Sequence, residues 1–272
     1  MKIAVGIATF NRLNYLQITA HSLANCVGVA DCAVRLYDDC SNEYGLDTLQ
    51  KLFPDARTIV RREANLGADR NMYQMYKDFL NTPDDVLLTL DSDMLLRTEC
   101  FDVIRQVLPH TDGILGLYNS AMHPAGKQLA VGDMQCVEKE HVGAAAVAMT
   151  RDIVAKIVEN VLPGKSYDWR WSQYLRDQKL RIIVTHDSYV QHIGLHGFNC
   201  DGGRSVDFGL NFYPDQAADQ KIAVDFLQEL LIAKDSHIEY LYRSIAYNLG
   251  NIFVLPVRGL YRAFCRMAGK GA

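Results

Sequence analysis

The feature of this sequence that most constrains its fold is a regular alternation of short apolar runs with segments whose apolar residues recur at helical spacing. Short apolar runs predict buried strands, and helical spacing predicts amphipathic helices. When strands and helices alternate along a chain, the strands form a mostly parallel sheet flanked by helices. The sequence therefore predicts an α/β fold. The expected strands lie at residues 3–8, 32–37, 58–60, 86–90, 113–118, 144–149 and 180–184, and the expected helices at residues 13–23, 72–80 and 151–161.

The character of the sequence changes near Pro214, after which helical patterns continue without further strand signals. We therefore expect one α/β domain over residues 1–213 and a helical C-terminal extension over residues 214–272. Within this extension, residues 238–268 are rich in aromatic and aliphatic side chains, contain several arginines and have no acidic residue after Glu239. Such a segment suits a peripheral contact with an anionic membrane surface, a contact between subunits of a homo-oligomer, or packing against the first domain.

Composition excludes several classes of protein. A length of 272 residues, 49% hydrophobic residues and a net charge of −4 describe a soluble globular protein, and the charge gives no reason to expect a nucleic-acid partner. The seven cysteines are odd in number and form no CxxC pair, which argues against a disulfide framework and against a zinc site. These features favour a cytoplasmic protein, with peripheral association at the inner face of the membrane as the alternative.

Two acidic residues follow the most apolar of the expected strands. Residues 86–90 run directly into Asp91-Ser92-Asp93, and an extended backbone directs the first and third side chains of this triplet to the same side. Mg²⁺ and Mn²⁺ prefer oxygen ligands, often only one or two carboxylates, and complete their shell with substrate phosphates and water. Asp91 and Asp93 are therefore candidate metal ligands, and Asp91 and Ser92 are candidate contacts of a phosphorylated substrate. A solvated turn is the alternative.

Four segments occur in the order seen in one enzyme family. They are Thr9-Phe10-Asn11-Arg12 after the first strand, residues 37–41 after the second, residues 65–71, and residues 90–93. In this order they resemble family-2-like GT-A glycosyltransferases, over roughly the first 210 residues of the chain. The resemblance implies a Rossmann-like GT-A fold that binds a nucleotide-sugar, specifically a UDP-sugar, together with Mn²⁺ or Mg²⁺.

The resemblance also implies which residues bind the nucleotide. It places Asp39 against the uracil base with Asp38 near it, and this chain departs from the family at Cys40, where glycine is usual and the turn is expected to be less tight. The structural alternatives are that Asp38 and Asp39 cap a helix and that Arg70 forms a surface ion pair. The resemblance further implies that the nucleotide pocket is lined by Thr9, Phe10, Asn11, Arg12, Asn65, Gly67 and Arg70.

An aspartate within an aromatic segment is the candidate catalytic base. Asp168 lies in Tyr167-Asp168-Trp169 at the expected start of a helix, and an acid half removed from water by large aromatic side chains binds a proton more tightly. The segment resembles the Asp-Trp stretch of N-glycan GlcNAc-transferases, which implies that Asp168 removes a proton from the acceptor hydroxyl in an inverting displacement. A helix cap, with Trp169 and Trp171 in the core, is the alternative.

Two histidines and one arginine complete the set of candidates. His192 and His196 lie in a glycine-containing segment that disfavours a continuous helix, and this segment resembles the histidine runs of N-glycan branching enzymes. The resemblance implies a histidine at the metal or the diphosphate; we favour His192, and a histidine bonded to a backbone carbonyl is the alternative. Arg204, in a glycine-rich loop, is a candidate for binding the diphosphate of the leaving UDP, or a plain surface residue.

These features predict a metal-dependent, inverting glycosyltransferase that moves a hexosyl or N-acetylhexosaminyl group from a UDP-sugar to a hydroxyl of a glycan or glycolipid, as in cell-surface glycan synthesis. Two other readings stay open: a nucleotide- or carbohydrate-binding protein of this fold without turnover, and a sugar nucleotidyltransferase. Nucleotidyltransferases usually need a glycine-rich basic loop after the first strand, and residues 8–11 do not form one. Dehydrogenases and P-loop enzymes are disfavoured because neither a GxGxxG after a strand nor a GxxxxGK[ST] occurs.

Overall fold

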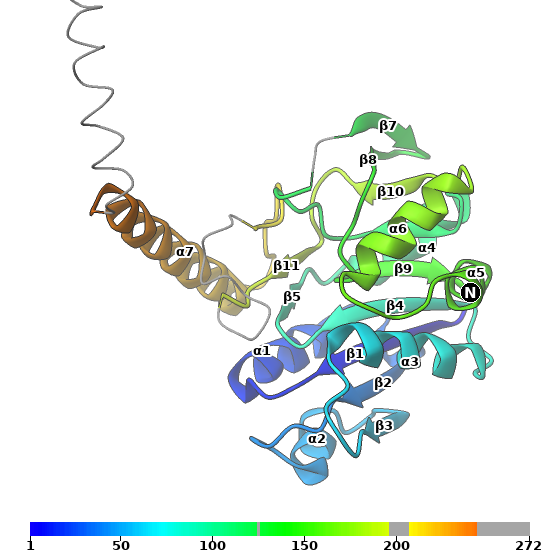
Figure 1. Ribbon diagram of the computed structural model, residues 1–272, viewed down its shortest axis with the longest axis horizontal. Coiled ribbons are helices and arrows are strands. Elements are labelled where there is room, and N and C mark those ends of the chain that lie inside the picture. The colour runs from blue at the N-terminus through cyan, green and yellow to red at the C-terminus, as the bar shows by residue number, and fades with distance from the viewer. Residues whose placement is uncertain (124–125, 196–206, 244–272) are drawn as a thin grey trace, which may run out of the picture.

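A nine-stranded sheet forms the centre of the molecule (Figure 1). Its strands are β1 (Ile3–Thr9), β2 (Ala33–Asp38), β3 (Thr58–Arg61), β4 (Val86–Asp91), β6 (Ile114–Gly116), β7 (Lys127–Val131), β8 (Met134–Lys139), β9 (Val147–Thr150) and β10 (Ile182–Thr185). This computed structural model describes residues 1–123, 126–195 and 207–243. The strand order is β3-β2-β1-β4-β9-β6-β10-β8-β7, and all strands point the same way except β9 and β8. The expected α/β fold with a mostly parallel sheet is confirmed.

Helices cover both faces of this sheet (Figure 1). They are α1 (Leu13–Ala24), α2 (Leu46–Leu52), α3 (Ala68–Leu80), α4 (Cys100–Val107), α5 (Arg151–Asn160), α6 (Tyr167–Asp177) and α7 (Ala217–Arg243). In β1, Ile3, Val5 and Ile7 belong to a core shared with α1, α2 and α4, whereas Ala4 belongs to the opposite core, shared with α3, α5 and α6. Because the central strands are buried on both faces, their sequences are almost continuously apolar.

The structure adds elements that the sequence patterns do not reveal. β7 and β8 form a hairpin around Gly132, and α4 belongs to the same core as α1. A separate two-stranded sheet pairs β5 (Met94–Leu96) with β11 (Val190–His192). Strands of three residues are too short to show a periodic pattern, so they escape detection in the sequence. The expected strand at residues 144–149 begins later, at Val147, since Ala146 has a left-handed backbone with φ 55°.

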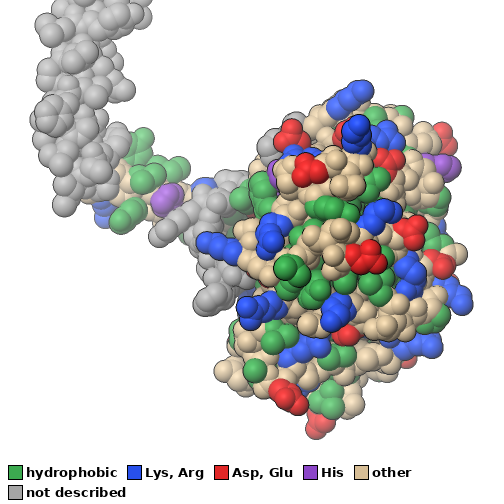
Figure 2. Space-filling model, turned by 45° about the vertical axis from the view of Figure 1, so that its right-hand side comes forward, with side chains coloured by type: hydrophobic (Ala, Val, Ile, Leu, Met, Phe, Trp, Pro, Cys, Tyr) green, Lys and Arg blue, Asp and Glu red, His purple; other side chains and the backbone are tan. Residues whose placement is uncertain are grey.

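The C-terminal extension is a single long helix over the described residues. α7 begins soon after Pro214, where the sequence predicts helical structure, and extends into the aromatic segment that begins at residue 238. Its first half packs through Phe226 and Leu230 against Ile193 and Leu195. Beyond this contact, α7 projects from the sheet (Figure 1) and presents hydrophobic side chains to solvent (Figure 2). The exposed apolar residues of this part are Leu231, Ile232, Ile238, Tyr240, Leu241 and Tyr242.

None of the helices in the described part of the chain has the length and apolar character needed to cross a membrane. The segment predicted to touch a membrane surface, residues 238–268, falls within α7 only up to Arg243. Its remaining residues, 244–268, lie outside the described residues. A peripheral contact or a homo-oligomer contact through this segment therefore stays a prediction.

Candidate functional site

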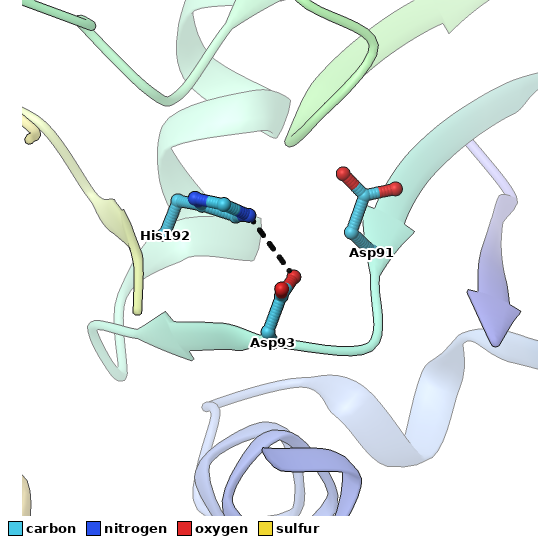
Figure 3. A group of neighbouring side chains, drawn as sticks. All are labelled: Asp91, Asp93 and His192. Atoms are coloured by element: carbon cyan, nitrogen blue, oxygen red, sulfur yellow. Dashed lines mark ion pairs between the residues drawn. The ribbon is translucent and has the colours of Figure 1, made fainter. Parts of the chain in front are cut away.

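The structure brings a histidine against the two candidate metal ligands of the Asp-Ser-Asp triplet (Figure 3). Asp91 is the last residue of β4, and Asp93 precedes Met94, the first residue of β5. In the small sheet Met94 lies opposite His192, and the backbone N–H of Ile193 donates to the carbonyl of Asp93 over 2.9 Å. One ligand atom from each of Asp91, Asp93 and His192 lies within 4.8 Å of the others. The pairing of β5 with β11 therefore assembles the site.

A buried threonine holds the turn that carries both acids. The hydroxyl of Thr19, on α1, donates to the carbonyl of Ser92 over 2.9 Å and accepts from the backbone N–H of Met94 over 2.8 Å. Thr19 is completely buried and Ser92 nearly so. Buried backbone groups need partners, so this hydroxyl satisfies two groups that the turn leaves unpaired. Thr19 gives no signal in the sequence, where it reads as one more residue of an amphipathic helix.

Charged side chains compensate one another at the centre of the site. Asp93 is 1% exposed; its Oδ2 lies 2.6 Å from Nη1 of Arg12, and its Oδ1 lies 3.2 Å from Nε2 of His192. Burial alone raises the pKa of Asp93, but His192 and then Arg12 outweigh burial and hold this pKa below its usual value. Burial, followed by the charge of Asp93, raises the pKa of Asp91. Although burial opposes it, the charges of Asp93 and Asp91 raise the pKa of His192 to about 9.

The residues present fit a divalent cation. Oδ1 of Asp93 is buried, and although it lies near His192, it accepts no hydrogen bond of good geometry from the described residues. A Cβ atom on Gly194 would stand 1.9 Å from Oδ2 of Asp93, so only glycine leaves room for this carboxylate. The two carboxylates suit Mn²⁺ and Mg²⁺, which prefer oxygen ligands, and the imidazole adds a nitrogen ligand of the kind that many divalent metal ions accept. Gly194 was not predicted from the sequence, where it serves only as a sign against a helix.

The turn after β1 meets the turn after β2. The backbone N–H of Asn11 donates to Oγ of Ser41 over 2.8 Å, and Oδ1 of Asn11 accepts from the backbone N–H of Asn42 over 2.9 Å. Asn11 and Arg12 have left-handed backbones, with φ of 51° and 57°, and Arg12 reaches Asp93 from this position. The polar groups after β1, β2 and β4 therefore meet at one edge of the sheet, as expected for the carboxyl ends of parallel strands. Phe10 is 38% exposed beside them, and Thr9 is buried.

The two aspartates predicted to bind the base hold loops together in this structure. Asp38 is fully buried; it accepts a hydrogen bond from Oγ of Ser41 and lies 3.2 Å from Nη1 of Arg61. Asp39 accepts hydrogen bonds from the backbone N–H groups of Leu66, over 2.8 Å, and Gly67, over 2.9 Å. The carboxylate of Asp39 thus fixes the loop that begins α3. Contact of either aspartate with a base stays a prediction.

Three further residues of these loops, all named from the resemblance, also have defined positions. Asn65 donates from Nδ2 to the carbonyl of Asp39 over 3.2 Å, and Arg70 is exposed on the first turn of α3. Cys40 has a left-handed backbone with φ 65°, a conformation that glycine adopts more easily. The chain takes this left-handed conformation in spite of the cysteine, and the less tight turn expected here stays a prediction.

Asp168 lies in the first turn of α6, near enough to Asp91 for the two charges to interact. Burial is the largest cause that raises the pKa of Asp168, and the charge of Asp69 adds to it. The charge of Asp168 in turn contributes to the raised pKa of Asp91. Oδ1 of Asp69 accepts from the backbone N–H of Tyr167 over 3.0 Å, which joins the start of α3 to the start of α6. The helix cap position belongs to Ser166, so the reading of Asp168 as a plain cap does not apply.

Two of the predicted candidates fall outside the described residues. His196 and Arg204 belong to residues 196–206, so the preference for His192 over His196 rests on the placement of His192 alone. Among the described residues, His192 is the histidine that lies with two acids in a group able to hold a metal ion. The alternative reading, with both Trp169 and Trp171 in the core, is wrong for one of them, because Trp171 is fully buried whereas Trp169 is 44% exposed.

Comparisons with known proteins identify the fold. No family model and no curated protein matches the sequence. Among solved structures, S. aureus TarS 1–349 in complex with UDP-GlcNAc has a TM-score of 0.57 at 16% identity, covering 91% of this chain and 78% of that one. The same protein with UDP has a TM-score of 0.53 at 16% identity, covering 70% of this chain and 60% of that one.

A third solved structure comes from another organism. The mannosyltransferase PcManGT from Pyrobaculum calidifontis, in complex with GDP-Man and Mn²⁺, has a TM-score of 0.52 at 11% identity, covering 98% of this chain and 84% of that one. Against the longer TarS structure, this chain spans 43% of the length. At these identities the likeness concerns the fold, and the chain has the GT-A architecture that its motifs implied.

Proposed function

We propose that this protein is a metal-dependent, inverting glycosyltransferase that moves a sugar from a UDP-sugar to a hydroxyl of an acceptor. The observation that carries the proposal is the assembly of Asp91, Asp93 and His192 within 4.8 Å at the edge of the sheet where ligands bind, with Asp168 near enough to interact with the charge of Asp91. The fold is shared with TarS, solved with UDP-GlcNAc, and with a mannosyltransferase solved with GDP-Man and Mn²⁺. Both neighbours support a nucleotide-sugar as the donor.

In this proposal the three ligands would hold Mn²⁺ or Mg²⁺, which when bound neutralises the charge of the diphosphate. Arg12 lies beside Asp93 and offers N–H donors that suit phosphate oxygens. Asp39 and the loop of Asn65 to Gly67 would contact the nucleoside, with Thr9, Phe10, Asn11 and Arg70 around it. The neutral form of His192 binds metal, so its raised pKa means that metal binding competes with a proton.

Asp168 would act on the acceptor. Its carboxylate accepts the proton of the acceptor hydroxyl while that oxygen forms a bond to the anomeric carbon. The bond between this carbon and the diphosphate oxygen breaks, and the nucleoside diphosphate leaves with the bonding electrons. Attack from the face opposite the leaving group inverts the anomeric configuration. A glycan or glycolipid of the cell surface would supply the hydroxyl, with residues 1–213 as the catalytic domain and residues 214–272 as the extension that contacts a membrane or a second subunit.

Thermal unfolding with a set of nucleotide-sugars tests the proposed function. We expect UDP-GlcNAc, UDP-glucose or UDP-galactose to raise Tm in the presence of Mn²⁺, because a ligand that binds only the folded state stabilises it. At a hundredfold excess over Kd the gain is about 2.7 kcal/mol, or about 5 to 10 °C for a chain of this size. Stabilisation by GDP-mannose alone would show that uridine is the wrong base. Equal stabilisation in EDTA would show that no metal is needed, and no effect of any nucleotide-sugar would refute the proposal.

The pH dependence of transfer is expected to reflect Asp168. A base works only when deprotonated, and burial raises the pKa of Asp168 above the ordinary value of 3.8. As pH falls, kcat should therefore decline at a higher pH than it would for an exposed aspartate. The measurement is kcat against pH at saturating donor and Mn²⁺, with metal binding followed separately at each pH because His192 also gains a proton in acid. A constant kcat down to pH 4 would contradict this role.

A further inference from the structure

An exposed tryptophan stands next to the candidate base. Trp169 follows Asp168 directly and is 44% exposed, which is unusual for so large an apolar side chain. Its indole packs against the imidazole of His141, with ring centroids 4.3 Å apart and an interplanar angle of 30°. The ring of His123 meets it edge-on, with centroids 5.8 Å apart and an angle of 87°. Two rings thus hold the orientation of the indole while leaving part of it open to solvent.

A glycine lies close to both the base and one of these rings. A Cβ atom on Gly143 would lie 3.9 Å from Oδ2 of Asp168 and also 3.9 Å from Cε1 of His123. These are ordinary van der Waals distances, so a methyl group would fit at Gly143, where it would contact both the carboxylate and the imidazole. The backbone of Gly143 is not left-handed. Neither steric crowding nor backbone conformation therefore requires glycine here.

A buried lysine fixes the chain that carries His123. Nζ of Lys139 donates to the carbonyl of Ser120 over 2.9 Å and lies 3.4 Å from the carbonyl of His123. Lys139 is 4% exposed, and Oγ of Ser120 donates to Oδ1 of Asp207 over 2.6 Å. The wall formed by His123 is therefore held in place before any ligand arrives, which lowers the entropy cost of binding.

The two histidines beside Trp169 have lowered pKa values, which favours their neutral forms. Burial, followed by the charge of Lys139, lowers the pKa of His123. Burial, followed by the charge of Arg176, lowers the pKa of His141. Neutral imidazoles donate and accept hydrogen bonds but do not attract phosphate. An aromatic face bordered by neutral hydrogen-bonding groups matches a sugar ring, which has apolar C–H faces and hydroxyls at its edge.

We infer that the space bounded by Gly143, His123 and Trp169 is the acceptor subsite, and that it takes a neutral pyranose. One face of this sugar would lie on the exposed part of Trp169, which places a hydroxyl of the ring at Asp168. The inference rests on the proposed function, since it takes Asp168 as the base, but it specifies the class of acceptor and the residues that select it.

Tryptophan fluorescence gives a direct test. The chain has two tryptophans, and because Trp171 is fully buried, a sugar that binds against the exposed indole should change the emission of Trp169. We expect methyl β-D-glucopyranoside, its galactose epimer or its N-acetylamino analogue to change the emission, with sorbitol and glycerol 3-phosphate giving no change. Gly143→Ala should weaken this binding about tenfold or more, since one added methyl group in a pocket has an effect of that size. The matched control is Gly45→Ala, where an added Cβ meets nothing within 4 Å.

The outcomes separate this inference from the proposed function. No emission change with any pyranoside, or a change with glycerol 3-phosphate alone, would refute a neutral pyranose acceptor even if UDP-sugars raise Tm. Loss of UDP-sugar stabilisation in Gly143→Ala would assign the space to the donor. If Gly143→Ala lowers Tm without ligand, His123→Ala replaces it, because it removes the opposite wall without adding atoms; unchanged pyranoside binding in that variant also refutes the inference.

Discussion

Asp93→Asn is expected to lower the rate of sugar transfer by about 10³-fold, because a catalytic metal contributes several kcal/mol of charge stabilisation. Asp93 is the most buried of the candidate ligands, and it contacts both His192 and Arg12. An amide of the same shape keeps the packing but removes the negative charge that attracts the cation. The variant should also lose the Mn²⁺-dependent part of the Tm increase with a UDP-sugar, which thermal unfolding measures directly.

Two further variants sharpen this test. Asp102→Asn removes a carboxylate of α4 that is 48% exposed and paired with Arg105, so it should leave both transfer and Tm close to those of the natural protein. Gly194→Ala keeps every ligand but places a Cβ atom 1.9 Å from Oδ2 of Asp93, so it should displace the carboxylate and lower transfer as Asp93→Asn does. If Asp93→Asn transfers at the natural rate in Mn²⁺, the metal site is assigned to the wrong residues.

Asp168→Asn is expected to lower kcat by about 10²- to 10⁴-fold, the usual contribution of a general base. The amide cannot accept the proton of the acceptor hydroxyl, yet it preserves the shape of the side chain at the start of α6. Because Asp168 is not among the proposed metal ligands, UDP-sugar and Mn²⁺ should raise the Tm of this variant as they do in the natural protein. The measurements are the initial rate of transfer at saturating substrates and the Tm with and without donor.

A control on the same helix distinguishes this loss from a general effect on α6. Asp177→Asn lies at the last residue of α6, where the carboxylate is exposed and accepts a hydrogen bond from Gln173. It should leave kcat unchanged. An Asp168→Asn protein with normal kcat would exclude Asp168 as the base. One that loses the donor-induced rise in Tm would instead place Asp168 in the donor site.

The fold and part of the site can be predicted from local sequence. The run at residues 86–90 predicts a strand covered on both faces, and β4 is such a strand. Asp91 therefore lies at the edge of the sheet where the carboxyl ends of the parallel strands meet. The alternation of strands and helices likewise predicts that the polar turns after β1 and β2 lie at this edge of the sheet. These features depend on periodicity and on the geometry of parallel sheets, which short stretches of sequence encode.

Other features depend on contacts between distant parts of the chain. The resemblance to known histidine runs implied His192 as a metal ligand, but His192 meets Asp93 because β11 pairs with β5, and a three-residue strand leaves no local pattern that would predict its partner. Gly194 matters only because Asp93 lies against it, and Trp169 is exposed while Trp171 is buried because α6 presents one side to the core. Sequence alone determined which chemical groups end the strands. Tertiary packing decided which of them meet, because burial and long-range pairing bring side chains together regardless of their separation along the chain.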